Sequence, residues 1–410
     1  MQTALTRLLE LSEEQKQQKG LQYTPGEIGG QVELWEDTIV RFREAAPEIR
    51  SLLKSLLEKK NKTCILAGAG TSEYIGYCLE GLWRKRLQVP VNVVSTTRLV
   101  TTPHHFIIPP YHTLLVSFAR SGNSPESVGA VKIADMVSDN IYNFTVTCNR
   151  EGALLKEASG HKKSFCFCLD QKTNDQGLAM TASFSNMVVA GQMAACILEL
   201  DKLMGRAEMM VQGGRSMLEL APDVALEISS LDFCRAVFLG DGANFGTAVE
   251  SHLKLQELTS GKVMCACNTF AGLRHGPEAV IDEHTLVVAY ISTDRFARKY
   301  QQDLLEEIAT KGIGKGVVAC GADLDRNIKA LARYCIDFDS HTRLDLPDEL
   351  TPPINVIAGQ LLGVFKSINL NLKPDAPSES GVIHRVVEGV KVYNPSAFYS
   401  TGKLEVVAER

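Results

Sequence analysis

The chain has no long uninterrupted run of apolar residues. No run approaches the roughly 18 consecutive apolar residues that a membrane-spanning helix needs. The segment 1–20 also lacks the apolar core and the small-residue cleavage site of a secretory signal. We therefore expect a cytoplasmic protein with no membrane partner.

Stretches rich in lysine and arginine are almost absent. The longest is "WRKR" at 83–86, and the net charge of the chain is -5. A protein that binds the phosphate backbone of nucleic acid needs a basic stripe. We expect no nucleic-acid partner.

The spacing of the cysteines does not fit a metal site. None of the 11 cysteines falls in a C-x-x-C pair. Cys166/Cys168 and Cys265/Cys267 are spaced as on one face of a strand, where cysteine acts as a small buried apolar residue. We expect reduced thiols, no metal and no cofactor.

With 410 residues the chain exceeds what one core usually holds, about 250–300 residues, so two domains are expected. Apolar segments that read as strands alternate with helical segments, which predicts an α/β fold of mostly parallel sheets flanked by helices. The expected strands begin the segments 63–87, 89–95, 113–137, 143–149, 164–170, 234–258, 262–269, 285–293, 316–321 and 335–339.

The pattern of the first half is repeated in the second. "AGAGTS" at 67–72 and "LGDGAN" at 239–244 both join an apolar strand to a helix, which indicates an internal duplication. The predicted organisation is an N-terminal helical arm, two α/β domains and a tail whose conformation, strand or loop, is left open. The corresponding ranges are 1–44, 45–215, 216–372 and 373–410.

The first glycine turn does not complete a dinucleotide-binding fingerprint. Gly68 and Gly70 follow a strand, but Tyr74 stands where a third glycine is required, and no acidic residue ends the second strand.

Hydroxyl groups instead gather at the ends of two neighbouring strands. The carboxyl ends of parallel strands open into one crevice, and helix starts there favour anions, so we expect a cradle for the phosphate of a small phosphomonoester. The plainer alternative is that the serines only cap helices. The candidate phosphate-binding residues are Thr71, Ser72, Ser121, Gly122, Asn123 and Ser124.

Charged residues in the duplicated half are the candidates for chemistry. Glu250, Lys254 and Glu257 fall on one stripe of a helix. The stripe is either an exposed ion pair or a charged face toward the crevice, where the lysine would tune a carboxylate base. His275 lies in the Gly/Pro loop "RHGPEAVID", and histidine is a residue type suited to proton transfer near neutral pH.

The motifs "GAGTSEYIG", "SFARSGNSPES", "GDGANFGTAVESHLKLQE" and "RHGPEAVID" together resemble those of tandem sugar isomerase (SIS) domain proteins. The resemblance spans about residues 45–395. It is greatest to the branch labelled tagatose-6-phosphate ketose/aldose isomerase or galactosamine-6-phosphate deaminase. It implies two SIS-type domains.

Comparison with the isomerase half of glucosamine-6-phosphate synthase implies the roles of individual residues. Thr71, Ser72 and the loop Ser121–Ser124 match its phosphate-binding residues. The charged helix matches its helix of Glu, Lys and catalytic Glu, so that Glu257 takes the place of the base, and His275 matches its catalytic histidine. A tail lysine of the synthase, proposed to open the sugar ring, has no counterpart here, where His384 and Arg385 stand in that segment.

The resemblance implies conversion of D-galactosamine 6-phosphate and water to D-tagatose 6-phosphate and ammonia. Aldose/ketose isomerisation without ammonia release and a non-catalytic sugar-phosphate-binding regulator are the alternatives, and galacto or gluco configuration of the sugar is left open. The resemblance also implies a homo-oligomer in which the histidine loop completes a neighbouring site. Because Ala243 and Asn244 replace Thr71 and Ser72 in the second half, we expect one phosphate cradle for each pair of domains.

Overall fold

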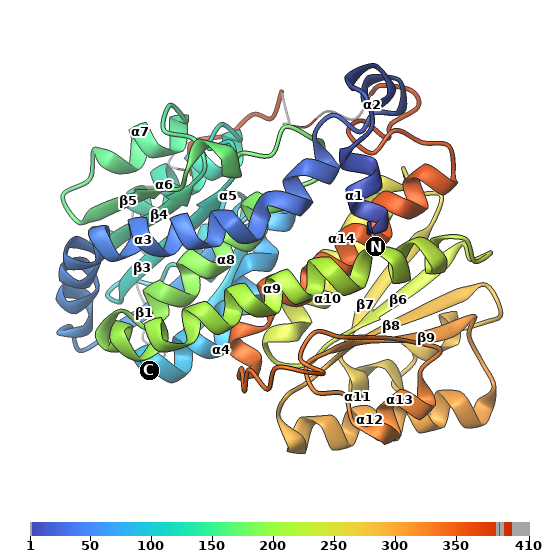
Figure 1. Cartoon of the computed structure of the whole chain (residues 1–410). Coiled ribbons are helices and arrows are strands. Elements are labelled where there is room, and N and C mark those ends of the chain that lie inside the picture. The colour runs from blue at the N-terminus through green and yellow to red at the C-terminus, as the bar shows by residue number, and fades with distance from the viewer. Residues whose placement is uncertain (1, 383–384, 386–388, 396–410) are drawn as a thin grey trace.

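The computed structural model describes residues 2–382, 385 and 389–395. Two five-stranded sheets lie at opposite sides of the molecule, with long helices between them (Figure 1). All strand pairs are parallel. The predicted α/β class is confirmed.

Each sheet is built from the strands that the apolar segments predict. The first contains β1 (Lys62–Gly68), β2 (Val91–Ser95), β3 (His112–Ala119), β4 (Ile141–Thr147) and β5 (Ser164–Cys168). The second contains β6 (Arg235–Leu239), β7 (Met264–Asn268), β8 (Thr285–Ile291), β9 (Gly316–Gly321) and β10 (Tyr334–Asp337).

The two sheets have the same topology. Their strand orders are β2-β1-β3-β4-β5 and, read from its other edge, β7-β6-β8-β9-β10. The glycine turns that follow β1 and β6 also agree, because Gly70 and Gly242 have φ values of 56° and 55°. At Gly68 an added Cβ would lie 2.2 Å from the Ser72 carbonyl carbon, so only glycine allows the helix to start so close to the strand. The predicted duplication is present in the fold.

Helices lie between and around the sheets. In the first half they are α1 (Ala4–Leu9), α2 (Glu13–Lys19), α3 (Thr24–Leu57), α4 (Thr71–Leu87), α5 (Thr96–Thr101), α6 (Pro125–Val137), α7 (Ala153–Ser159) and α8 (Ala182–Ala195). In the second they are α9 (Leu200–Ser229), α10 (Ala243–Leu258), α11 (Phe270–Leu273), α12 (Arg295–Lys311), α13 (Arg326–Leu331) and α14 (Pro352–Asn369).

The helices α3 and α9 cross the positions where the sequence places domain boundaries. Helix α3 runs through residue 44 and α9 runs through residue 215. The described part of the tail, 373–382, 385 and 389–395, contains no strand, so the open alternative is resolved in favour of a loop there. Within the described residues, no helix combines the length and apolar character that crossing a bilayer requires.

Helices α4 and α10 hold the two halves together. Each starts at the glycine turn of its own sheet, and they pack against each other. At Gly246 an added Cβ would lie 2.4 Å from the backbone nitrogen of Cys78, so the two helices are in close contact at this point. This packing brings the second half of α10 beside the start of α4, where Lys254 contacts Thr71.

Candidate active site

A crevice of about 530 Å³ opens where the start of α4 meets the second half of α10. We call it the first crevice. Its polar lining includes Thr71, Arg120, Lys254, Glu257 and Arg385. It therefore collects residues from the first glycine turn, the end of β3, the duplicated half and the tail.

Lys254 lies at the centre of the charged stripe. Its Nζ is 3.3 Å from Glu250 Oε1 and 2.6 Å from Glu257 Oε2, and it donates to Thr71 Oγ1 at 3.0 Å. The side chains of Lys254 and Glu250 are fully buried, while 31% of the Glu257 side chain is exposed. The alternative of an exposed ion pair is therefore wrong, because packing of α10 on α4 removes the stripe from solvent.

Glu250 and Glu257 differ in burial, and their carboxylates therefore have different environments. Desolvation raises the pKa of Glu250 to about 8, although Lys254 opposes this shift, and the Oε2 atom of Glu250 has no hydrogen-bond partner among the described residues. For Lys254, burial acts to lower the pKa, but the neighbouring carboxylates raise it above the ordinary value. Glu257 is thus the carboxylate that is both paired with a stable cation and open to the crevice.

The hydroxyl groups at the two strand ends have different environments. Strands β1 and β3 are neighbours in the sheet, so the turn at Thr71 and the loop at Ser121 lie at the same sheet edge. Thr71 Oγ1 is 3.3 Å from Glu250 Oε1, and Ser72 Oγ is 3.8 Å from the sulfur of Met180. Ser72 does not cap α4 through its side chain, since the capping residue is Gly70.

In the β3 loop, hydrogen bonds to the backbone fix the chain. Ser124 caps α6 by accepting from Ser127 N, and Pro125 lies in the first turn of the helix. Ser121 Oγ accepts from Asn123 N, and Asn123 Oδ1 accepts from Ala153 N. Gly122 has a φ of 62°, which favours glycine. Ser121 and Ser124 are half-buried rather than enclosed, but they are not among the residues that line the first crevice.

Arg120 is a site residue that the sequence analysis does not identify. It stands directly before Ser121, is 7% exposed, and donates to the carbonyl groups of Leu178 at 3.2 Å and Arg385 at 2.8 Å. Burial lowers its pKa from the ordinary value, which leaves a guanidinium that is still charged near neutral pH. The sequence feature that could have identified Arg120 is a lone arginine at the end of a predicted strand, directly before the serine loop.

The remaining candidates lie elsewhere. His275 is exposed, and it is not among the residues that line the first crevice. Arg385 lines the crevice and donates to the Asp175 carbonyl at 2.7 Å, which anchors the tail. His384 lies outside the described residues. No group of three potential metal ligands occurs among the residues that the structure describes.

The two parallel sheets are related by duplication, and a charged stripe from the second half lines a crevice at the first glycine turn. This fold and this site define the class of tandem sugar isomerase domain proteins. No protein-family model matches the chain. The C-terminal domain of glucosamine-fructose-6-phosphate aminotransferase from Francisella tularensis shares the fold, with a TM-score of 0.72 at 20% identity, covering 88% of this chain and 98% of that one.

More similar proteins place the chain within this class. D-galactosamine-6-phosphate deaminase AgaS of Shewanella sp. is 32% identical over 93% of this chain and 95% of its own length. The crystal structure of tagatose-6-phosphate ketose/aldose isomerase from Escherichia coli has a TM-score of 0.81 at 30% identity, covering 90% of this chain and 96% of that one. The chain belongs to the AgaS family of D-galactosamine-6-phosphate deaminases.

Proposed function

We propose that the chain converts D-galactosamine 6-phosphate and water to D-tagatose 6-phosphate and ammonia in the first crevice. The observation that carries the proposal is the buried Lys254 beside Glu257, which is partly open to the crevice. The Shewanella relative is named for this substrate, and the Escherichia coli isomerase is named for its ketose product. The pairing supports a proton-abstracting enzyme rather than a passive sugar-phosphate receptor.

The phosphate of the substrate anchors at the shared edge of β1 and β3. We assign its binding to Thr71, Ser72 and the loop 121–124, and we add Arg120 because its buried charge faces the same crevice. A buried guanidinium forms stronger hydrogen bonds with a dianion than hydroxyl groups do.

The reaction begins when His275 assists opening of the sugar ring. In the open-chain aldehyde the C2 proton is acidic, and Glu257 removes it to give an enolamine. Protonation at C1 then gives a ketimine at C2, and water hydrolyses it to the ketose with release of ammonia. Lys254 stabilises the negative charge that develops during proton abstraction, as preorganised cations do.

His275 acts in the crevice of another copy of the chain within a homo-oligomer. Its exposed position in its own chain, away from the residues that line the first crevice, supports this arrangement. Mixing inactive Glu257→Gln and His275→Ala chains under exchange conditions tests it. For a dimer, equal mixing restores about a quarter of wild-type activity, because half the dimers carry one intact site. Absence of any recovery, with subunit exchange verified, contradicts a shared site.

The direct test of the function is an assay of ammonia and ketose phosphate formation. Galactosamine 6-phosphate is compared with glucosamine 6-phosphate and tagatose 6-phosphate. The proposal predicts equimolar ammonia and tagatose 6-phosphate from the first substrate. Interconversion of tagatose 6-phosphate with an aldose phosphate, without ammonia from either amino sugar, would instead establish plain isomerisation.

A further inference from the structure

The duplication produces a second crevice at the opposite end of the α4–α10 pair. A cavity of about 620 Å³ opens between the start of α10 and the last turns of α4, similar in size to the first crevice. Its lining repeats that of the first crevice with the helices exchanged. The matched pairs, all 172 positions apart, are Gly70 with Gly242, Thr71 with Ala243, Leu253 with Gly81, Lys254 with Leu82, and Glu257 with Lys85.

The chemistry of the second crevice differs from that of the first. Lys85 stands where the first crevice has Glu257, and Leu82 stands where it has Lys254. The crevice therefore lacks the carboxylate base and its buried cation. The pair of base and buried cation that the first crevice offers for proton abstraction is therefore not repeated at the matching positions.

A carboxylate of the protein already occupies the second strand end. Asp348 accepts from Thr293 N at 2.6 Å, from Thr293 Oγ1 at 2.9 Å and from Ser292 Oγ. Thr293 is the counterpart of Ser121 in the first half. An incoming phosphate therefore cannot bind at this loop and must be held elsewhere in the crevice.

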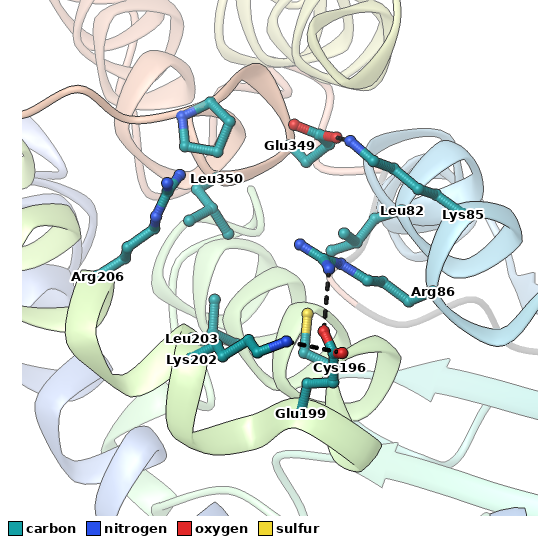
Figure 2. Close-up of a pocket in the computed structure, with 11 residues that line it drawn as sticks. Leu82, Lys85, Arg86, Cys196, Glu199, Lys202, Leu203, Arg206, Glu349 and Leu350 are labelled. Carbon is teal, nitrogen blue, oxygen red and sulfur yellow. Dashed lines mark hydrogen bonds and ion pairs between the residues drawn. The ribbon is translucent and has the colours of Figure 1, made fainter.

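A cationic cavity of about 320 Å³ adjoins the second crevice (Figure 2). The two share Leu82, Lys85, Arg206, Pro347 and Glu349. Four cations and two carboxylates line it. Lys85 pairs with Glu349 at 2.8 Å, while Arg86 and Lys202 both pair with Glu199, at 3.3 Å and 2.9 Å. Arg206 forms no ion pair with any described residue, and Glu199 is shared by two cations. The four cations and two carboxylates therefore leave the cavity with two uncompensated positive charges.

The outer part of the second crevice is acidic. Asp294 and Asp345 lie in its lining, and Asp345 is exposed. A second anionic group at this end would be repelled, whereas hydroxyl or amino groups find hydrogen-bond acceptors there. The polarity fits a ligand with one phosphate and an uncharged or cationic remainder.

We propose that the second crevice binds a small phosphate monoester, of the size of a hexose phosphate, without converting it. The phosphate lies among Lys85, Arg86 and Arg206, and the remainder extends toward Asp294. Arginine and lysine bind a phosphate dianion through charge-assisted hydrogen bonds. The site is separate from the first crevice and does not depend on which reaction takes place there.

Equilibrium dialysis of the full chain with radiolabelled glucose 6-phosphate tests the proposal. The variant Lys85→Gln/Arg206→Gln removes two phosphate-binding cations, and Lys54→Gln/Lys60→Gln is the matched control at exposed lysines that line neither crevice. Folding should be preserved because Lys85, whose side chain is 64% exposed, loses a single ion pair and Arg206 forms none with any described residue. Thermal unfolding verifies this.

The proposal predicts that the wild type and the control bind one more equivalent per chain than the crevice variant does. At that site the variant is weakened about tenfold or more, as loss of charge-assisted contacts implies. Fructose 1,6-bisphosphate should compete at this site no better than glucose 6-phosphate. Equal stoichiometry and affinity in all three proteins, or tighter competition by the bisphosphate, would overturn the proposal.

Discussion

Lys254 shows how a single residue links stability to function. Its ammonium group is fully buried, and it is held by two carboxylates and one hydroxyl group. Burial of a charge is costly unless the charge is paired, so these contacts are a requirement of the fold as well as a feature of the site. From the sequence, the stripe was also compatible with a solvated helix face, because its burial depends on the packing of α10 against α4.

Replacing Lys254 with methionine should destabilise the protein by about 3–5 kcal/mol, because Glu250 and Glu257 lose their common cation. In the double variant Lys254→Met/Glu250→Gln part of this loss should be recovered, since no buried carboxylate is left without a cation at position 250. Chemical denaturation measures both variants. A single variant as stable as the wild type would contradict the described burial.

Glu27 should make stability depend on pH. Burial and the nearby Asp175 raise its pKa to about 7, although its carboxylate accepts from Gln176 N and Gly177 N. Because the folded-state pKa lies above the unfolded value, the folded protein retains a proton that the unfolded chain releases, so stability falls as pH rises from about 4.5 to 7.

The variant Glu27→Gln should remove this contribution. The stability of the wild type relative to the variant should fall by about 3 kcal/mol between pH 4.5 and pH 8. Denaturant titrations at several pH values measure the difference. A parallel pH dependence in both proteins would show that Glu27 does not titrate in this range.

Among the elements, strands were predictable and the connection between the halves was not. Short apolar runs predicted all ten strands, because local pattern and fold agree there. The predicted boundary at 215/216 and the neighbouring Gly213 and Gly214 lie within helix α9. An added Cβ would lie 2.4 Å from the Trp35 ring at Gly214 and 2.9 Å from Ile354 at Gly213, so tertiary packing outweighs the low helix propensity of glycine.

The tail is anchored to the start of α3 by contacts that only the tertiary structure reveals. The Asp375 carboxylate accepts from Gln22 N at 2.7 Å, Thr24 N at 2.8 Å and Thr24 Oγ1 at 2.7 Å at the start of α3. Its backbone carbonyl accepts from Leu178 N at 3.0 Å. Two residues later, Pro377 and Ser378 line the first crevice. Contacts between residues some 350 positions apart leave no periodic signal in the sequence. The contacts of Arg120 with Leu178 and Arg385 leave none either.

Asp375→Ala should detach the tail from the start of α3. Loss of several hydrogen bonds to a carboxylate should cost about 2–4 kcal/mol of stability, and the displaced tail should raise KM for the sugar phosphate more than it lowers kcat. Denaturation and steady-state kinetics measure the two effects. Glu379→Gln, in an exposed pair with Lys262, is the control and should change neither. An unchanged KM in Asp375→Ala would separate the tail from the site.

At the scale of the whole molecule, one hydrophobic core is shared by both halves. It includes Leu66 and Phe144 from the first sheet, Phe238 and Val288 from the second, and residues of α14 between them. The first crevice lies across the two halves and requires this arrangement. We therefore expect the chain to unfold as a single cooperative unit.

Gly246→Val should disturb this arrangement at its closest point. The new side chain meets the Cys78 backbone, so we expect a loss of about 2–3 kcal/mol and a marked fall in activity. Gly205→Ala, in α9 with open space around its Cβ, should raise the free energy of unfolding by about 0.5–1 kcal/mol.

Circular dichroism and tryptophan fluorescence of the wild type should report one coincident unfolding transition. Separate transitions in the wild type would contradict a common core.

The most direct test of the account is the rate of ammonia release from galactosamine 6-phosphate by Glu257→Gln. Glu306→Gln, at an exposed position on α12, serves as the control. The account predicts that Glu257→Gln lowers kcat about 10²–10⁴-fold while the affinity for the sugar phosphate is retained, and that the control is unaffected. Turnover by Glu257→Gln within a few fold of the wild type would show that another group removes the C2 proton.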